Sequence, residues 1–238
     1  MNALLKQKIE TRLSNFDFNE GLKLNSLPEH VRYDLLERGT HIELPRKEAL
    51  YREGDSPKGI YILKSGKIKI TQLSVDGTVQ ILFIFSDGVI FGHRTILGND
   101  KQTISALALE NCKLIFIEKE HFLKVLHSSP EFSRILIQSV SHEFTILINR
   151  INIFAQRGIK ERLALFLLML NETYRIPNQF QYASEINMNR NDLAAFIGTS
   201  VENLVRTLRT FKANNYVSTS GKSIFITDFD MLYTLAKI

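Results

Sequence analysis

The pattern of hydrophobic and polar positions changes twice along the 238-residue chain, and each change predicts a different kind of structure. From about residue 41 to residue 117, short runs of β-branched and aromatic residues alternate with turn dipeptides such as Asp87-Gly88. Their spacing of roughly 10–12 residues is typical of a compact all-β sandwich or barrel. After Pro130, neither Gly nor Pro occurs again before Gly158, which predicts a helix of several turns.

Further local elements are expected outside and inside the β-rich region. Residues 2–16 carry a helical pattern with apolar positions at Leu4, Leu5, Ile9 and Leu13. A short helix should follow Pro28, a residue suited to the first helical position. Asp76-Gly77, between two apolar runs, is a signal for a β-hairpin with a two-residue turn. Another helix is expected over residues 161–172.

The long helix after Pro130 carries an unbroken heptad series. Its six apolar positions follow one another at alternating spacings of three and four residues, and they are Ile137, Val140, Phe144, Leu147, Ile151 and Phe154. Such a series is typical of a seam between two helices, so it predicts a homodimer interface. The alternative is an amphipathic helix lying on its own barrel, and Ile146, Ile148 and Ile153 widen the apolar surface enough for both.

The C-terminal third has the pattern of a helix-turn-helix. A short helix is expected over residues 191–197, and a second one from about residue 200 to residue 214. Ala194 allows close helix contact, Gly198 permits the tight turn, and Leu204 returns to the core. The stripe expected to be buried on the second helix consists of Leu204, Leu208 and Phe211.

A different side of the second helix is expected to face solvent and DNA, because a helix of this shape fits the major groove. Arg206 can donate two hydrogen bonds to guanine O6 and N7, Glu202 can accept one from cytosine N4, and Val201 can contact a thymine methyl group. A β-hairpin wing is expected over residues 216–227, with Lys222 in its turn placed to meet a phosphate. The candidate DNA-binding residues are Ser200, Val201, Glu202, Asn203, Arg206, Arg209 and Lys222.

These residues also have local explanations. Glu202 and Arg206 could form a surface ion pair four residues apart on the helix. Thr199 and Glu202 also fit a capping box. Only the complete assembly of helix, glycine turn, helix and wing favours DNA binding over these alternatives.

Composition and charge narrow the class of protein further. With 44% hydrophobic residues, the chain can form one large domain or two smaller ones. The net charge of +5 permits DNA binding, and residues 157–238 carry ten Lys and Arg against seven Asp and Glu. The longest apolar runs, such as residues 163–170, are too short to span a membrane, and residues 1–10 show no secretory signal. We therefore expect a cytoplasmic protein.

Four stretches resemble the cyclic-AMP receptor protein/Fnr (Crp/Fnr) family of transcription regulators. They are YREGD at residues 51–55, GIYILKSGKI at 59–68, DGVIFG at 87–92 and DLAAFIGTSVENLVRTL at 192–208. The resemblance runs from about Leu27 to Thr227. It implies an α+β chain with three parts: a cyclic-nucleotide-binding-like β-barrel of the double-stranded β-helix or jelly-roll type over residues 1–130, a long dimerisation helix over 131–157, and a C-terminal winged helix-turn-helix over 158–238.

The resemblance also implies a DNA-binding regulator rather than an enzyme. The expected partners are double-stranded DNA with a near-palindromic site, a second copy of the chain and, as a candidate, RNA polymerase, with no membrane. The family's base-reading Glu and Arg, four residues apart, match Glu202 and Arg206. The position before that Glu is Arg in the cyclic-AMP receptor protein and Val in Fnr-like members. Because Val201 stands there in this chain, we expect an Fnr-like half-site.

The sensor region departs from the cyclic-AMP binders of the family. Those proteins carry a Gly-Glu pair, whose Glu meets a ribose hydroxyl, and about ten residues later an Arg-Ser pair whose Arg clamps the cyclic phosphate. Here the first pair is Gly92-His93, the counterpart of the second is Gln102-Thr103, and residues 99–104 contain no Arg. A lysine in this window can supply charge but not the planar fork of a guanidinium. The sequence therefore argues against cyclic AMP, and the candidate effector-binding residues are Gly92, His93, Lys101, Gln102 and Thr103.

The cysteines and histidines of the chain limit which other cofactors of the family it could bind. Cys112 is the only cysteine, so one chain cannot supply the several cysteines of an iron–sulfur cluster. His93 invites comparison with the haem ligand of gas-sensing members, but a lone His in a loop is more often an ordinary polar contact. No metal site is expected.

Two other classes of function remain as alternatives. A metal-dependent barrel enzyme of the cupin type would need a His-x-His pair with a further carboxylate and histidine. The six histidines contain no such pair, and they are His30, His41, His93, His121, His127 and His142. A protein-binding scaffold with a winged-helix appendage is opposed only by the exposed face that carries Glu202 and Arg206.

Overall fold

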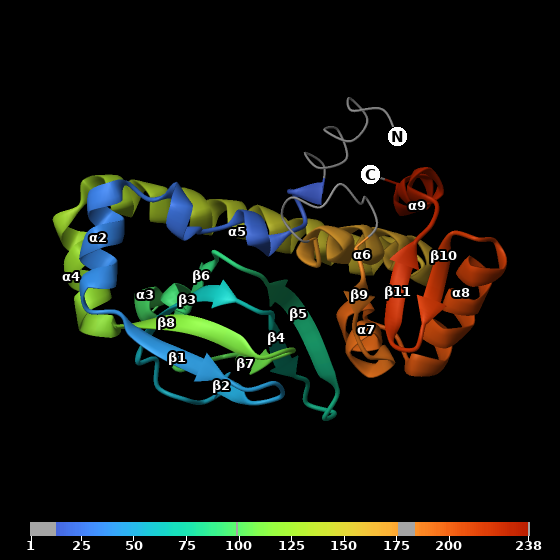
Figure 1. Ribbon diagram of the computed structural model, residues 1–238, viewed down its shortest axis with the longest axis horizontal. Helices are drawn as coiled ribbons and strands as arrows, with labels where there is room; N and C mark the ends of the chain where they lie inside the picture. The colour runs from blue at the N-terminus through green and yellow to red at the C-terminus, as the bar shows by residue number, and fades with distance from the viewer. Residues whose placement is uncertain (1–12, 99, 176–183, 238) are drawn as a thin grey trace. The chain divides into compact units, whose positions relative to one another are not determined.

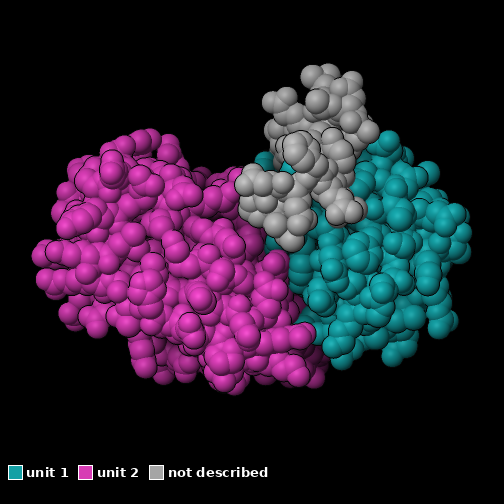
Figure 2. All heavy atoms as spheres, in the orientation of Figure 1, with its two compact units in different colours: residues 1–17, 145–238 teal, residues 18–144 magenta. Residues whose placement is uncertain are grey.

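The computed structural model describes residues 13–98, 100–175 and 184–237, and the chain divides into two compact units (Figure 2). One unit consists of residues 18–144, and the other combines residues 1–17 with residues 145–238. The helix predicted over residues 2–16 lies almost entirely outside the described residues. The predicted division has three parts, a sensor, a dimerisation helix and a DNA-binding domain, and it is defined by function. The two compact units do not test it, so it stays a prediction.

Residues 18–144 contain two four-stranded antiparallel sheets (Figure 1). In spatial order, the strands of the first sheet are β1 (Thr40–Leu44), β8 (Cys112–Glu118), β3 (Gly59–Ser65) and β6 (Ile90–Phe91). Those of the second sheet are β2 (Ala49–Tyr51), β7 (Ser105–Ala108), β4 (Ile68–Leu73) and β5 (Val79–Phe85). The two orders, 1-8-3-6 and 2-7-4-5, are those of a jelly roll. The predicted fold of the sensor is therefore confirmed.

Alternate side chains of β3 pack on opposite faces of its sheet. The ring of Tyr61 lies 5.9 Å from that of Tyr51 in the second sheet, so it fills the space between the sheets. Ile60 and Ile62 belong instead to a buried cluster on the outer face, together with side chains of α2 and α4. A strand buried on both faces needs a continuous apolar run, which β3 has. The short helices around these sheets are η1 (Phe18–Glu20), η2 (Leu24–Ser26), α2 (Glu29–Glu37), α3 (His93–Gly98) and α4 (Lys119–Ser128).

Two local predictions in this unit need correction. Pro28 occupies the N-cap of α2 rather than its first helical position. The β4–β5 hairpin turns through three residues rather than two, because the Ser74 backbone N–H donates to the Thr78 carbonyl at 2.9 Å. Gly77 closes this loop with φ +82°, a left-handed conformation that suits the last position of a three-residue hairpin.

Helix α5 (Pro130–Gln156) confirms the predicted long helix. Phe132, Leu136, Ile146 and Ile153 are buried within the single chain. The heptad series keeps substantial exposed area at every position, with exposed fractions of 69% at Ile137, 37% at Val140, 64% at Phe144, 37% at Leu147, 67% at Ile151 and 36% at Phe154. Large apolar side chains left open along one helix point to a binding surface. Packing of α5 within its own chain uses mainly residues outside the heptad series, and Phe154 is the member of the series whose ring also stacks on Phe166, 5.9 Å away.

The unit that ends the chain is a winged helix. Its elements are the end of α5, α6 (Ile159–Thr173), β9 (Ile186–Asn187), α7 (Arg190–Ile197), α8 (Val201–Ala213), β10 (Val217–Ser220), β11 (Ser223–Ile226) and α9 (Phe229–Ala236). The strands form a small antiparallel sheet in the order β10-β11-β9. The predicted stripe of Leu204, Leu208 and Phe211 is buried. Both the helix-turn-helix and the wing are thus confirmed.

The turn between α7 and α8 is held by Gly198. This residue takes φ +71° and its N–H donates to the Ala194 carbonyl at 2.9 Å, which ends α7. A side chain here would also be crowded, because a Cβ would lie 2.9 Å from Cε1 of Phe154. Helix α8 follows, and Ser200 caps its N-terminus: the Ser200 hydroxyl accepts from the Asn203 N–H at 3.2 Å. The N-cap is therefore Ser200, and the alternative capping box through Thr199 is wrong.

Candidate nucleic-acid interface and effector window

Helix α8 has two distinct faces. Its apolar stripe is buried, whereas Glu202, Arg206 and Arg209 are all exposed. Hydrogen bonds from its own backbone N–H and from the Ser200 hydroxyl lower the pKa of Glu202. The carboxylate is therefore ionised at neutral pH and can accept hydrogen bonds. Val201 is half-buried, so only part of its side chain can reach a ligand.

Arg206 does not pair with Glu202. Its Nη2 donates to Oδ1 of Asn203 at 2.6 Å, one turn earlier on α8. Among the ion pairs of the described residues, none joins Glu202 to Arg206. The surface ion pair considered as an alternative is thus not formed. The guanidinium is instead oriented by a neutral side chain and keeps other N–H donors that can serve a ligand.

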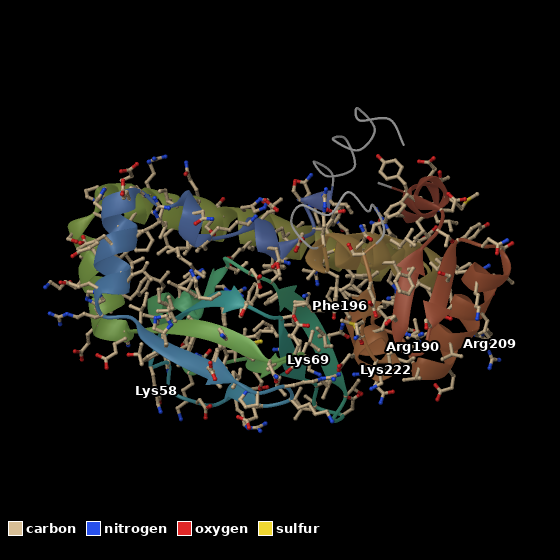
Figure 3. All side chains as sticks on the ribbon, in the orientation of Figure 1. Lys58, Lys69, Arg190, Phe196, Arg209 and Lys222 are labelled. Carbon is tan, nitrogen blue, oxygen red and sulfur yellow. The ribbon has the colours of Figure 1, made fainter. Side chains whose placement is uncertain are left out.

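The wing presents Lys222 at the turn between β10 and β11. This lysine is exposed, and within the described part of the chain it forms no ion pair. Arg190, which was not anticipated from the sequence, donates from its Nη1 to the Lys222 carbonyl at 2.9 Å. Figure 3 shows Arg190 and Lys222 next to each other at the wing. In the sequence, Arg190 is only a basic residue at the start of the first helix of the motif, and this position alone does not predict a contact with the wing.

The proposed effector window contains one buried polar residue with several structural partners. Gln102 donates its backbone N–H to the Asp55 carbonyl at 2.8 Å and accepts at its own carbonyl from the Gly54 N–H at 2.7 Å. Its side-chain Oε1 accepts from the Thr95 hydroxyl at 2.9 Å. Gln102 therefore connects α3 to the loop before β3. Lys101 and Thr103 are exposed beside it.

Gly92 and His93 lead from β6 into α3. Gly92 has φ +92°, and a Cβ there would lie 3.1 Å from the Gly59 carbonyl oxygen, so the position requires glycine. His93 is 1% exposed, and its Nε2 lies 3.6 Å from Oε1 of Glu143 on α5. Burial lowers the pKa of His93 to about 3, with the nearby Arg94 lowering it further, so the ring is neutral.

His93 belongs to a buried polar cluster with few internal partners. Nε of Arg94 lies 3.5 Å from Oε2 of Glu143, and burial raises the pKa of this carboxyl. Both ring nitrogens of His93, the Ser139 hydroxyl and Oε2 of Glu143 are buried and have no hydrogen-bond partner among the described residues. Arg94 and Glu143 were not predicted from the sequence, because the family pattern places the arginine about ten residues after the pair that corresponds to Gly92-His93. The structure places His93 toward α5, and its contact with an effector stays a prediction.

The described residues offer neither a metal site nor a reactive thiol. No three His, Cys, Asp or Glu side chains come together in these residues as a candidate metal site. Cys112 is buried, its thiol donates to the Lys67 and Glu110 carbonyls, and burial raises its pKa. None of the helices in the described ranges is both long and apolar enough to cross a membrane.

Comparison with known proteins gives the class of the chain. Residues 41–129 match the cyclic nucleotide-binding domain, and residues 161–235 match the Crp-like helix-turn-helix domain. The transcriptional activator protein Anr of Pseudomonas protegens is 28% identical over 221 residues, which cover 90% of this chain and 87% of Anr. The fumarate and nitrate reduction regulatory protein of Yersinia pestis is 27% identical over 207 residues, 85% of this chain and 80% of that protein.

A solved structure shows the same fold. FixK2 from Bradyrhizobium japonicum aligns with a TM-score of 0.73 at 20% identity, covering 83% of this chain and 96% of FixK2. The sensor jelly roll, the helix-turn-helix and the relatives agree, and the chain belongs to the Crp/Fnr family of transcription regulators. The prediction of a regulator rather than a cupin-type barrel enzyme is confirmed by these relatives.

Proposed function

We propose that this Crp/Fnr-type regulator binds a near-palindromic DNA site as a homodimer and reads base edges with α8. The observation that carries the proposal is the exposed guanidinium of Arg206, which Asn203 orients and which has no acidic partner among the described residues. Beside it lies the ionised carboxylate of Glu202. A cationic fork next to an anionic acceptor, on one exposed helical face, matches the donors and acceptors of a G·C pair.

The other proposed contacts surround this pair. Ser200 is the N-cap of α8, and Val201 and Asn203 lie in its first turn, where a helix that enters the major groove comes nearest to the bases. Arg209 is exposed further along the same helix, and Lys222 is placed to meet a phosphate from the wing. Val201 favours a half-site of the Fnr type, since its side chain can contact a thymine methyl group but cannot donate a hydrogen bond.

The dimer would form along α5. The six exposed heptad positions supply the knobs that a helix–helix seam requires, and they leave too much apolar surface open for an isolated chain. Two copies of α8 related by the dimer axis would then meet successive major grooves about 34 Å apart. RNA polymerase is the further partner in this proposal, and the cytoplasm is where the protein would meet its DNA.

The effector is proposed to differ from cyclic AMP. A cyclic phosphate needs a cationic clamp, and the best one is a guanidinium that offers two parallel hydrogen bonds. Residues 100–104 contain no arginine, and the side chain of the buried Gln102 already accepts a hydrogen bond from Thr95. The nearby Arg94 lies outside these residues, and its guanidinium contacts the Glu143 carboxylate. Gly92, His93, Lys101, Gln102 and Thr103 remain the proposed effector contacts. Since Cys112 is the only cysteine, a multi-cysteine iron–sulfur ligand set cannot come from one chain, and a haem ligated by His93 would require its buried ring to turn away from Glu143.

Selection of bound sites from random double-stranded DNA tests the proposed function directly. We expect a near-palindrome with half-site centres one helical turn apart, and sedimentation should show two chains on each selected duplex. Failure to enrich any sequence would favour a winged helix that binds protein. Calorimetry with cyclic AMP should show no binding at physiological concentrations, and saturable submillimolar binding would contradict the proposal for the effector.

A further inference from the structure

The wing is attached to the segment before α7 and to α7 itself. On one side, β11 pairs with β9, with Ser223 opposite Asn187, and the Ser223 hydroxyl donates to Oε1 of Glu185 at 2.5 Å. On the other side, the Arg190 guanidinium reaches across from the start of α7 to the Lys222 carbonyl. Of these contacts, the pairing with β9 and the Glu185 bond hold strand β11 of the wing. The Arg190 bond is the one that holds the turn.

The position of Arg190 is fixed by the start of α7 and by two backbone carbonyls. It is the first residue of α7, directly after the N-cap Asn189, whose side chain accepts from the Asp192 N–H. Its Nη1 donates to the Lys222 carbonyl at 2.9 Å and lies 3.4 Å from the Met188 carbonyl, so one cation joins the segment before α7 to the wing turn. The side chain is half-buried, and this burial lowers its pKa.

The two residues of the turn, Gly221 and Lys222, project beyond the paired residues Ser220 and Ser223. Gly221 takes φ +55°, and a Cβ at this position would meet no atom within 4 Å, so this side of the turn faces open space. Lys222 itself is exposed. A mobile lysine that binds a phosphate loses conformational freedom when it binds, and this loss weakens the complex. A contact that orders the turn beforehand reduces that loss.

We propose that Arg190 is a positioning residue: by holding the Lys222 carbonyl, it orders the wing turn and presents the Lys222 ammonium to a DNA phosphate. This inference rests on the proposed DNA-binding function. Arg190 acts through Lys222 and not by its own contact with DNA. The guanidinium suits this role better than an ammonium group, because its planar, rigid fork loses less freedom for each hydrogen bond that it makes.

A double-mutant cycle with Arg190→Gln and Lys222→Ala tests the proposal on the full chain. Affinity for the selected duplex should fall about three- to tenfold in Arg190→Gln, the scale expected for one unordered side chain. The same substitution in the Lys222→Ala background should change neither the affinity nor the salt dependence, because there is no longer an ammonium to position. Lys212→Gln, which removes an exposed charge at the end of α8, is the matched control for charge alone.

Additive effects would overturn the proposal. If Arg190→Gln still weakened binding in the Lys222→Ala background, and lowered the salt slope by a further unit or so, Arg190 would contact a phosphate itself. Arg190→Lys keeps the charge but not the fork, so it should behave like Arg190→Gln. Wild-type affinity in Arg190→Lys would show that DNA binding needs only a positive charge at this position, and it would contradict the role of the guanidinium fork.

A measurement without DNA separates this inference from the proposed function. Backbone ¹⁵N order parameters of Gly221 and Lys222 should fall in Arg190→Gln, while those of α8 stay at their wild-type values. Unchanged order parameters at the turn would overturn the positioning role even if DNA binding were confirmed. Equal DNA affinity of the wild type and Lys222→Ala would contradict the proposed phosphate contact, and the order parameters would still decide whether Arg190 holds the turn.

Discussion

The guanidinium of Arg206 is bonded to the side chain of Asn203, 2.6 Å away, and not to the carboxylate of Glu202 on the same face of α8. An ion pair would have neutralised the two groups in the free protein, and DNA would have had to break it. A neutral amide orients the guanidinium without satisfying its charge. The relationship therefore leaves both ionic groups available to bases, and it is the structural basis for the predictions on DNA recognition.

The exposed heptad series predicts that dimerisation depends on α5. Phe144→Asp combined with Leu147→Asp should convert a dimer into monomers, because two unpaired carboxylates buried in each half of the seam would cost several kcal/mol. The measurement is sedimentation at micromolar concentration. Gln138→Asp with Asn152→Asp adds the same charge at exposed positions of α5 outside the heptad series and should leave the dimer intact. A wild-type protein that sediments as a monomer would refute the seam.

The buried pair of His93 and Glu143 predicts opposite contributions to the pH dependence of stability. The His93 pKa falls from 6.5 to about 3 on folding, so its contribution is complete above pH 6.5 and is lost as the pH falls toward 3. The Glu143 pKa is raised above 4.5, so its contribution is present below that pH and is lost as the pH rises through the folded value. His93→Gln should therefore flatten the loss of stability between pH 6.5 and 4.5.

Urea unfolding at several pH values measures this effect through the free energy of unfolding. His127→Gln removes an exposed histidine from the end of α4 and serves as the control for the loss of a histidine at the surface. If His93→Gln and the wild type lost stability in parallel below pH 6.5, the ring of His93 would not be held neutral in the fold.

The turn of the helix-turn-helix predicts a specific cost for a side chain at residue 198. Gly198→Ala and Gly221→Ala both place an alanine at positive φ, which costs about 1–2 kcal/mol. At Gly198 the new Cβ also meets the Phe154 ring, whereas at Gly221 it meets open space. Gly198→Ala should therefore lower the free energy of unfolding by roughly 1–3 kcal/mol more than Gly221→Ala. Equal losses in urea unfolding would mean that the Phe154 ring moves aside freely.

Local patterns predicted those parts of the fold whose causes lie close together in the sequence. The heptad series of α5 and the Gly198 turn depend on residues within a few helical turns, so spacing alone revealed them. The two-residue hairpin at Asp76-Gly77 was wrong by one residue, because the Ser74–Thr78 hydrogen bond decides the length of the loop and leaves no mark in composition.

Contacts between distant residues could not be predicted in this way. His93 faces Glu143, which lies fifty residues later, only because α3 and α5 meet in the folded unit. Arg190 contacts a backbone carbonyl in the wing, and any residue at position 222 would provide that acceptor. For α8, residue type and helical spacing predicted which side chains are buried and which are exposed. For His93 and residues 100–103, they did not predict the direction in which the side chains point.

Base reading by Arg206 is the central claim, and parallel selection of sites from random DNA with the wild type, Arg206→Ala and Lys222→Ala tests it most directly. Arg206→Ala should relax the preference at one G·C pair in each half-site, with a loss of roughly 1–3 kcal/mol at that pair, and keep the preferences elsewhere. Lys222→Ala should weaken binding to all sequences alike and reduce its dependence on salt. If Arg206→Ala kept the wild-type preference at every position, Arg206 would not read a base, and direct readout of the half-site by this residue would be contradicted.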